Sequence, residues 1–270
     1  RKFKFSLPKI KGFEFRDEMM DGFHVIAGKK TGTKPDRAVV YFPGGGSRRW
    51  QLPYRGSIRN YIEGTGAELW IPLYPLLPDY DLMDETEFTI RLHEKMLKRF
   101  PAENIVWLGI SGGADVLMQA GRHMVKKYPE LPMPGLMLPV SVSGLLMSED
   151  AKTRMRGIDS RNPILHWDMF ETMVKYYNPN GDLPQYILGK ADEDDYTGFP
   201  KIIMYFGGDE VFAGIAPDYE KSFIRCGVKD YEIKIKEGMP HAYPVFTFLK
   251  EGREGEREII ADINRYFESR

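Results

Sequence analysis

A serine between glycines is the residue of this chain whose surroundings could make it a nucleophile. Residues 107–115 read WLGISGGAD, so an apolar run ends at Ser111 and a helix-like sequence follows at once. A sharp turn from strand to helix needs small neighbours, because a Cβ at Gly109 or Gly113 would collide with the packed strand or helix. Such a turn exposes the hydroxyl in front of a helix N-terminus, which favours developing negative charge. The pattern predicts a nucleophile; a glycine-rich turn with an incidental serine is the alternative.

A serine nucleophile needs a base to take its proton and an acid to orient that base. Asp209 follows the apolar run 201–206 in a glycine turn, and His241 follows the alternating run 231–236. Active sites in open α/β sheets collect at the carboxyl ends of the strands, so we expect these side chains to meet the serine there. The order serine, aspartate, histidine is that of the α/β-hydrolases. Two alternatives remain open: Glu210 could be the acid instead of its neighbour, and His241 could be an incidental loop histidine.

Glycines after an early strand could supply N–H groups for an oxyanion. The run 38–42 is almost wholly apolar and the next five residues, 43–47, read PGGGS. The amides of Gly44 and Gly45, with that of Gly112 after the serine, fit an oxyanion hole. A phosphate-binding loop is the alternative, but neither a P-loop lysine nor a GxGxxG spacing follows.

The elements that would hold these residues alternate along the chain. Two antiparallel edge strands are expected at 12–16 and 23–27. Further strands are expected at 38–42, 67–72, 104–108, 135–142, 201–206 and 231–236, and helices at 54–63, 84–100, 114–128, 215–226 and 256–267. Alternation of strand and helix predicts the α/β class, with a mostly parallel central sheet and flanking crossover helices.

One segment, 148–198, interrupts the alternation. It is rich in charge, carries no strand pattern and is far longer than an ordinary connection in an α/β unit, so we expect an inserted helical cap within a single domain, 1–270.

Four aromatic side chains are expected to wall the pocket. Trp167 and Phe170 lie in the expected cap, and Trp50 and Tyr54 lie in the loop after the glycines. Aromatic stripes more often belong to a core than to a ligand site, which is the alternative for all four.

Composition and charge exclude several classes of protein. The chain has 38 Lys and Arg residues and 39 Asp and Glu residues, so its net charge is −1. This charge does not indicate a nucleic-acid-binding protein. The single cysteine, Cys226, allows no intramolecular disulfide and no cysteine metal cluster, and no metal or cofactor is required. No apolar run is long enough for a membrane span and the N-terminal residues lack a signal core, so cytoplasmic is the default expectation, although the chain does not begin with Met. A small molecule is the expected partner.

In their order along the chain, these motifs resemble the hormone-sensitive-lipase-like branch of the α/β-hydrolases, which includes acetyl esterases and carboxylesterases. The resemblance covers about residues 38–248. It rests on PGGG at 43–46, YPLLPD at 74–79, GISGG at 109–113, GDE at 208–210 and EGMPHAY at 237–243. The family carries HGGG, YRLAPE and GDSAGG at the first three of these places. Pro43 therefore replaces a histidine, with loss of an N–H, and Ile110 replaces an acidic residue before the serine.

The resemblance implies a serine esterase without a cofactor. Ser111 would attack an ester carbonyl, His241 would take and return the proton, Asp209 would hold the histidine, and water would cleave the acyl-enzyme. Short acyl groups are the expected substrates, because the family includes many short-chain esterases. An amide-cleaving relative, such as a peptidase or arylformamidase, and a catalytically inactive binding protein on the same fold are the alternatives. A homodimer through the edge strand 231–236 is a further possibility, although the lysines on that strand could equally protect a free edge.

Overall fold

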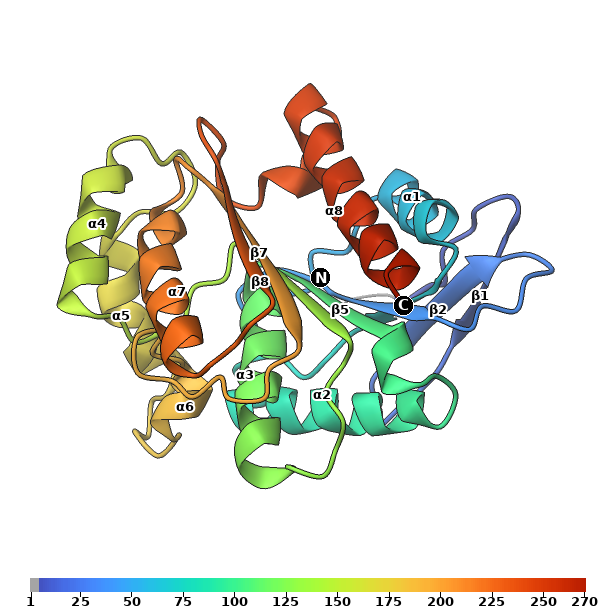
Figure 1. Ribbon diagram of the computed structural model, residues 1–270, viewed down its shortest axis with the longest axis horizontal. Helices are drawn as coiled ribbons and strands as arrows, with labels where there is room; N and C mark the ends of the chain where they lie inside the picture. The colour runs from blue at the N-terminus through green and yellow to red at the C-terminus, as the bar shows by residue number, and fades with distance from the viewer. Residues whose placement is uncertain (1–4) are drawn as a thin grey trace.

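A mixed sheet forms the centre of the computed structural model, which describes residues 5–270 (Figure 1). Within these residues the sheet has 8 strands in the order β1-β2-β4-β3-β5-β6-β7-β8. Its strands are β1 (Phe13–Asp17), β2 (Val25–Lys30), β3 (Ala38–Phe42), β4 (Glu68–Pro72), β5 (Ile105–Ile110), β6 (Leu136–Val140), β7 (Lys201–Gly207) and β8 (Tyr231–Lys236). β1 pairs antiparallel with β2 and β2 with β4, whereas every pair from β4 to β8 is parallel. The predicted α/β class with antiparallel edge strands is confirmed.

Helices cover both faces of the sheet because the central strands are apolar on both sides. On β5, Trp107 packs into one core and Leu108 into the other, as the alternation of side chains along a strand requires. One core includes α2 (Leu82–Leu97), α3 (Gly112–Lys127) and α7 (Ala216–Arg225), and the other includes α1 (Arg55–Thr65) and α8 (Lys250–Glu268). Figure 1 shows α1 and α8 side by side, with α2 and α3 on the opposite face. None of the helices in residues 5–270 is long and apolar enough to cross a membrane.

The C-terminal helix begins six residues before its predicted start. Two residues of its first turns, Gly252 and Gly255, have low helix propensity. In the structure α8 starts at Lys250, and these glycines allow a close approach: a Cβ at Gly252 would lie 2.2 Å from the carbonyl oxygen of Phe246. The loop that follows His241 is thereby packed directly on the helix.

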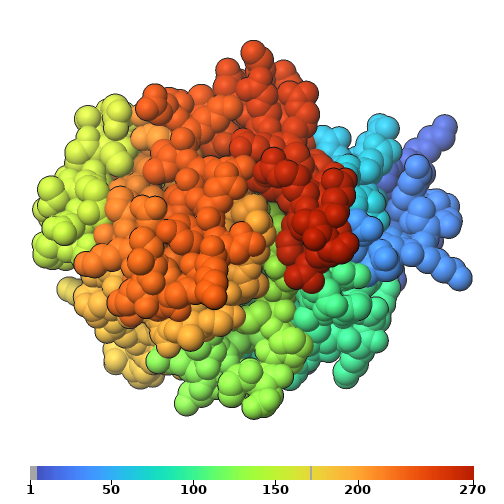
Figure 2. Space-filling view, viewed as in Figure 1, coloured from blue at the N-terminus to red at the C-terminus, as the bar shows by residue number. Residues whose placement is uncertain are grey.

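The segment 148–198 contains three helices between β6 and β7. They are α4 (Glu149–Asp159), α5 (Asp168–Tyr177) and α6 (Gln185–Leu188). A parallel bridge joins Lys190 of this segment to Leu146. Figures 1 and 2 show this segment on the side of the molecule opposite β1 and β2.

Candidate active site

The turn between β5 and α3 holds Ser111 in a strained conformation. Its φ of 53° and ψ of −124° lie outside the regions that a residue with a Cβ normally occupies. The flanking glycines are required by contact, because a Cβ at Gly109 would lie 2.3 Å from the Gly113 carbonyl oxygen and one at Gly113 would lie 2.1 Å from that of Phe42. The turn therefore presents the hydroxyl at the carboxyl end of the sheet, in front of the first turn of α3.

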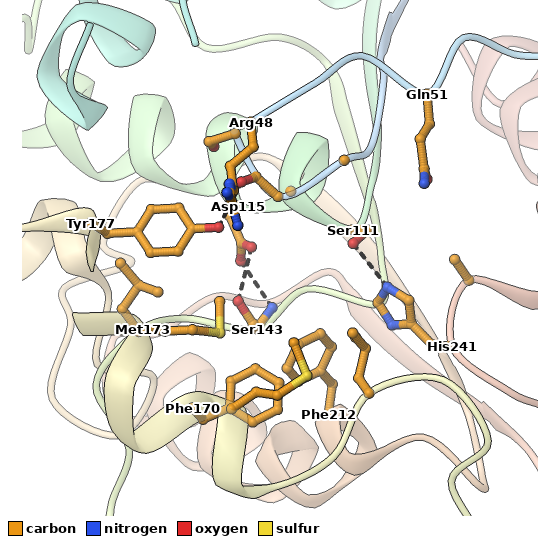
Figure 3. A pocket seen from close by; sticks show the side chains of 18 of the residues that line it. Arg48, Gln51, Ser111, Asp115, Ser143, Phe170, Met173, Tyr177, Phe212 and His241 are labelled. Atoms are coloured by element: carbon orange, nitrogen blue, oxygen red, sulfur yellow. Dashed lines mark hydrogen bonds between the residues drawn. The ribbon is translucent and has the colours of Figure 1, made fainter. Parts of the chain in front are cut away.

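His241 lies within hydrogen-bond distance of both the serine and a carboxylate. Its Nε2 is 2.8 Å from Ser111 Oγ (Figure 3). Its Nδ1 is 2.6 Å from Glu210 Oε2. With the proton on Nδ1, the ring donates to Glu210 and accepts from the serine hydroxyl. This arrangement leaves Nε2 free to take the serine proton.

The prediction that Asp209 is the acid beside the histidine is wrong, and its neighbour Glu210 holds that position. The turn after β7 directs the two side chains to opposite sides. Asp209 is 27% exposed and lies 3.6 Å from the Arg161 guanidinium, whereas the Glu210 side chain is buried against the histidine. The turn itself contacts the histidine loop, because the Asp209 N–H donates to the Met239 carbonyl oxygen at 3.0 Å.

Ser141, which the sequence analysis did not identify, joins the acid to the histidine loop. Its hydroxyl donates to Glu210 Oε1 at 2.7 Å and accepts from the Ala242 N–H at 2.9 Å. The Gly207 N–H donates to the same carboxylate oxygen at 2.7 Å. Ser141 is fully buried at the end of β6 and has a φ of 56°, a conformation that non-glycine residues rarely adopt.

The glycine loop contributes a different pair of glycines to the cavity from the expected pair. Gly45 and Gly46 line the cavity together with Gly112, whereas Gly44 forms a bridge with Gln51, and a Cβ on it would lie 3.4 Å from the Ser111 Cβ. A Cβ on Gly112 would lie 2.7 Å from the Gly46 nitrogen, so these two amides are close neighbours beside the serine. Of the expected donors, Gly45 and Gly112 line the cavity, and Gly44 lies next to Ser111 without lining it.

Tyrosine hydroxyls brace the same loop, on which Pro43 stands in place of the histidine seen in the resembling family. The Tyr74 hydroxyl donates to the Pro43 carbonyl oxygen at 2.5 Å, and the Tyr177 hydroxyl donates to that of Gly46 at 2.6 Å. The loop is thus fixed from the buried core and from α5.

A cavity of about 1180 Å³ adjoins the serine and the histidine. Helix α5 and the residues before it form one wall, and Phe212 and Phe246 form part of another. Of the four aromatic side chains expected here, only Phe170 lines the cavity, in T-shaped contact with Phe212 at 5.0 Å between ring centroids.

The other three expected aromatic residues lie elsewhere. The Trp50 indole donates to the Tyr74 carbonyl oxygen at 3.0 Å, and Tyr54 is 59% exposed just before α1. The ring of Trp167 lies under the Arg156 guanidinium, 4.7 Å from its centroid. Sequence alone gave no orientation for these rings, which is why the prediction was wrong for them.

Burial raises the pKa of two carboxyl groups in and beside the cavity. Loss of solvent raises the pKa of Asp115, which lines the cavity, although hydrogen bonds from Gly144 and Ser143 oppose that rise. Burial raises the pKa of Glu85 well above its usual range, although a hydrogen bond from the Ser47 hydroxyl opposes that rise. Across the described chain no group of three or more His, Cys, Asp or Glu side chains could hold a metal ion.

Comparison with known proteins decides the family. A family model described as the α/β-hydrolase fold matches residues 39–245. The chain belongs to the α/β-hydrolase family. The comparison with curated proteins gave no match.

Solved structures of esterases share the α/β-hydrolase fold over nearly the whole chain. An esterase from the bacterial hormone-sensitive lipase family has a TM-score of 0.81 at 18% identity, over 96% of this chain and 86% of that one. An esterase/lipase from an uncultured bacterium has a TM-score of 0.81 at 16% identity, over 97% and 87%. A putative esterase from Staphylococcus aureus has a TM-score of 0.80 at 16% identity, over 97% and 88%. The α/β-hydrolase fold expected from the motifs is confirmed.

Proposed function

We propose that this α/β-hydrolase cleaves carboxylic esters with Ser111 as nucleophile, His241 as general base and acid, and Glu210 as the residue that orients the histidine. The observation that carries the proposal is the unbroken series of hydrogen bonds from Ser111 Oγ through the imidazole to the Glu210 carboxylate, at 2.8 and 2.6 Å. The strained φ of the serine supports it, because such strain is maintained at nucleophile turns.

The reaction follows from these positions. His241 Nε2 takes the proton of the serine hydroxyl as Oγ attacks the ester carbonyl, and the resulting imidazolium is stabilised by Glu210. The same nitrogen then returns the proton to the leaving alcohol, and water repeats the sequence on the acyl-enzyme.

The oxyanion of each tetrahedral intermediate would be held by backbone N–H groups beside the serine. The closeness of the Gly46 nitrogen to Gly112 supports this pair as donors, with Gly45 next to them. Removal of one such donor generally costs about 10²–10³ in rate. Helix α5 and its flanking residues would act as the cap that keeps bulk water from the intermediate.

The test is covalent labelling of the serine. A fluorophosphonate probe should modify the protein once, at Ser111, and Ser111→Ala should abolish both labelling and hydrolysis of p-nitrophenyl butyrate. Ser269→Ala is the matched control, because that hydroxyl only donates to the Tyr266 carbonyl oxygen at the C-terminus. Absence of labelling in intact protein, together with residual hydrolysis that Ser111→Ala leaves unchanged, would make the chain a binding protein on a hydrolase fold.

Ester and amide substrates distinguish the remaining activities. Matched esters and anilides with the same acyl group should be compared by kcat/KM. Preference for the esters supports the proposal, whereas turnover of amides or N-formyl compounds alone would assign an amide-cleaving enzyme.

A further inference from the structure

The cavity follows one face of α3 away from the nucleophile. Ser111, Asp115 and Gln119 are spaced four residues apart and all three line the cavity. With a rise of 1.5 Å per residue, the carboxylate and the amide lie about 6 Å and about 12 Å along the helix axis from the serine. A substrate bound at the serine would therefore extend along these two polar groups.

Gln119 has a buried side-chain oxygen without a hydrogen-bond partner among the described residues. Its side chain lines the cavity at 3% exposure, and its Oε1 accepts no hydrogen bond from any residue in 5–270. A buried polar group of this kind costs free energy unless something satisfies it. Its position on the cavity wall leaves a ligand group as a possible partner.

Asp115 keeps acceptor capacity toward the same space. Its Oδ1 accepts from the Ser143 and Gly144 N–H groups at 2.9 and 3.0 Å, and its Oδ2 accepts from the Ser143 hydroxyl at 2.8 Å. A carboxylate has about four lone-pair sites, so these three bonds fix its position and leave room for one donor. Asp115 is partly exposed, and it lines the cavity (Figure 3).

This end of the cavity is distinct from the reacting end. Figure 3 shows Asp115, Ser143 and Tyr177 grouped on one side, with Ser111 and His241 on the other. The Tyr177 hydroxyl donates to Gly46, so its oxygen can still accept a hydrogen bond. The polar groups here thus include two oxygen acceptors, an amide that can both donate and accept, and the Arg48 guanidinium, which lines the cavity and is drawn beside Asp115 in Figure 3.

We propose that this polar end of the cavity binds a hydroxyl group of the substrate, so that the preferred esters carry a hydroxylated acyl or alcohol part. A hydroxyl can donate to Asp115 and accept from the Gln119 amide, which matches both kinds of group. An unsubstituted alkyl chain offers these groups no hydrogen bond. An ammonium group could donate to Asp115 and to the Gln119 oxygen, but it has no lone pair to accept from the amide nitrogen, and the Arg48 guanidinium that lines the same cavity would repel it. The proposal rests on the proposed ester hydrolysis and changes the expected substrate from a plain short-chain ester to a hydroxylated one.

Matched ester pairs test the hydroxyl directly. Methyl hexanoate is compared with its ω-hydroxy and ω-amino derivatives for the acyl side, and hexyl acetate with the same derivatives for the alcohol side. We expect a higher kcat/KM for the hydroxylated ester in one series. In Gln119→Met, which keeps the side-chain length, that preference should fall about tenfold. Gln185→Met, the same substitution on exposed α6, should leave the ratio unchanged.

Two outcomes would overturn the hydroxyl subsite. The first is a kcat/KM for the alkyl ester that equals or exceeds that for the hydroxylated ester in both series, with no effect of Gln119→Met. The second is a higher kcat/KM for the ammonium derivative than for the hydroxylated ester. Binding to Ser111→Ala, measured by calorimetry, separates this inference from the proposed reaction. Selective binding of the hydroxylated ester without any hydrolysis by the wild-type protein would refute the reaction and keep the subsite. Hydrolysis by the wild-type protein without selective binding of the hydroxylated ester would refute the subsite and keep the reaction.

Discussion

Glu210 and Asp209 are adjacent in the chain, yet their side chains have opposite surroundings. The Glu210 carboxylate is wholly buried and accepts from Ser141, Gly207 and His241. The Asp209 carboxylate is partly exposed beside Arg161, which is itself exposed. The buried Glu210 carboxylate can therefore stabilise an imidazolium, whereas solvent screens the charge of the neighbouring Asp209 carboxylate.

Neutralising each carboxylate in turn tests this assignment. Glu210→Gln should lower kcat about 10⁴-fold, because an amide neither favours the required tautomer nor stabilises the imidazolium. Asp209→Asn should change kcat by less than about twofold, since an exposed ion pair contributes little. Steady-state kinetics on p-nitrophenyl butyrate measures both, and a larger loss in Asp209→Asn would return the role to the aspartate.

Ser141 is expected to position the acid rather than to touch substrate. Ser141→Ala removes one donor to Glu210 and leaves the buried Ala242 N–H without its acceptor. We expect kcat to fall about tenfold with KM unchanged. Ser222→Ala, at another fully buried serine, is the control and should leave kcat unaltered. A rise in KM with constant kcat would contradict a positioning role.

The sequence predicted those site residues whose positions follow from the order of strands along the chain. It did not predict those whose positions depend on the direction of a side chain. Ser111 and His241 follow recognisable strands, so their meeting at one edge of the sheet could be inferred. The choice between Asp209 and Glu210 depends on the geometry of one turn, and the sites of Trp50 and Trp167 depend on rotamers, none of which a residue pattern contains.

Helix α2 supports the glycine loop through one buried contact. The Ser47 hydroxyl donates to Glu85 Oε2 at 2.9 Å, and both side chains are buried. Desolvation raises the pKa of Glu85 well above its ordinary value, and the nearby Asp115 adds to the effect. The folded protein therefore holds a proton on Glu85 that the unfolded chain releases at lower pH.

This raised pKa gives a stability prediction with a definite sign. Above the ordinary glutamate pKa the folded state binds more protons than the unfolded state, so the wild-type free energy of unfolding falls as pH rises toward the folded-state value. Glu85→Gln removes this ionisable group, so the free energy of unfolding of the variant near pH 8 should exceed that of the wild-type protein by about 1 kcal/mol. Urea unfolding from pH 5 to 8 measures it. Glu94→Gln, on the exposed face of α2, should leave the pH slope unchanged, and an equal slope in Glu85→Gln would refute the argument.

Element boundaries were predictable where local signals agree with packing. Strand β3 and strand β8 match their expected ranges, because apolar or alternating runs end at clear turns. The start of α8 was missed because Gly252 and Gly255 disfavour a helix locally, while their close packing on the loop after His241 requires it. Tertiary contact there outweighs propensity.

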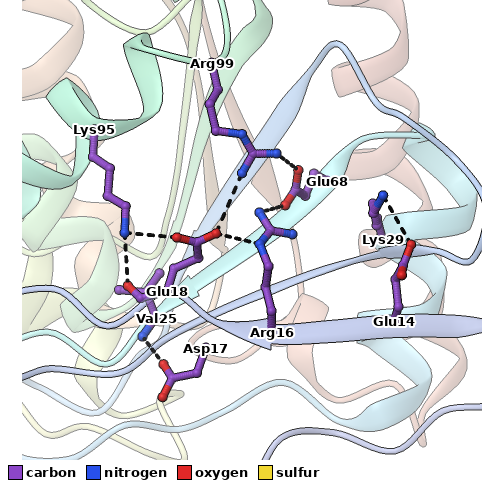
Figure 4. Close-up of polar contacts among 9 residues, drawn as sticks. All are labelled: Glu14, Arg16, Asp17, Glu18, Val25, Lys29, Glu68, Lys95 and Arg99. Carbon is purple, nitrogen blue, oxygen red and sulfur yellow. Dashed lines mark hydrogen bonds and ion pairs between the residues drawn. The ribbon is translucent and has the colours of Figure 1, made fainter.

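Across the whole molecule, the antiparallel strands join the parallel sheet through charged groups at the end away from the active site. Glu68, the first residue of β4, is fully buried and pairs with Arg16 of β1 and with Arg99 after α2, whose guanidinium is 2.8 Å away (Figure 4). Both guanidinium groups lie 5.5 Å from the ring centroid of Trp70. No local pattern links Arg16 to Glu68, so the sequence could not predict this connection.

Glu68 is therefore expected to contribute to stability without affecting activity. Glu68→Gln leaves the two guanidinium groups with a neutral partner. Because both guanidinium groups remain partly exposed to solvent, we expect the free energy of unfolding to fall by about 2 kcal/mol, less than for breaking a fully buried pair. Glu14→Gln is the matched control at the exposed Lys29 pair on the same hairpin, where the loss should stay under about 0.5 kcal/mol. Urea unfolding measures both, and kcat/KM at 25 °C should be unchanged because β4 begins at the opposite end of the sheet from Ser111. Equal stabilities of the two variants would mean that the buried carboxylate does not hold the antiparallel strands to the parallel sheet.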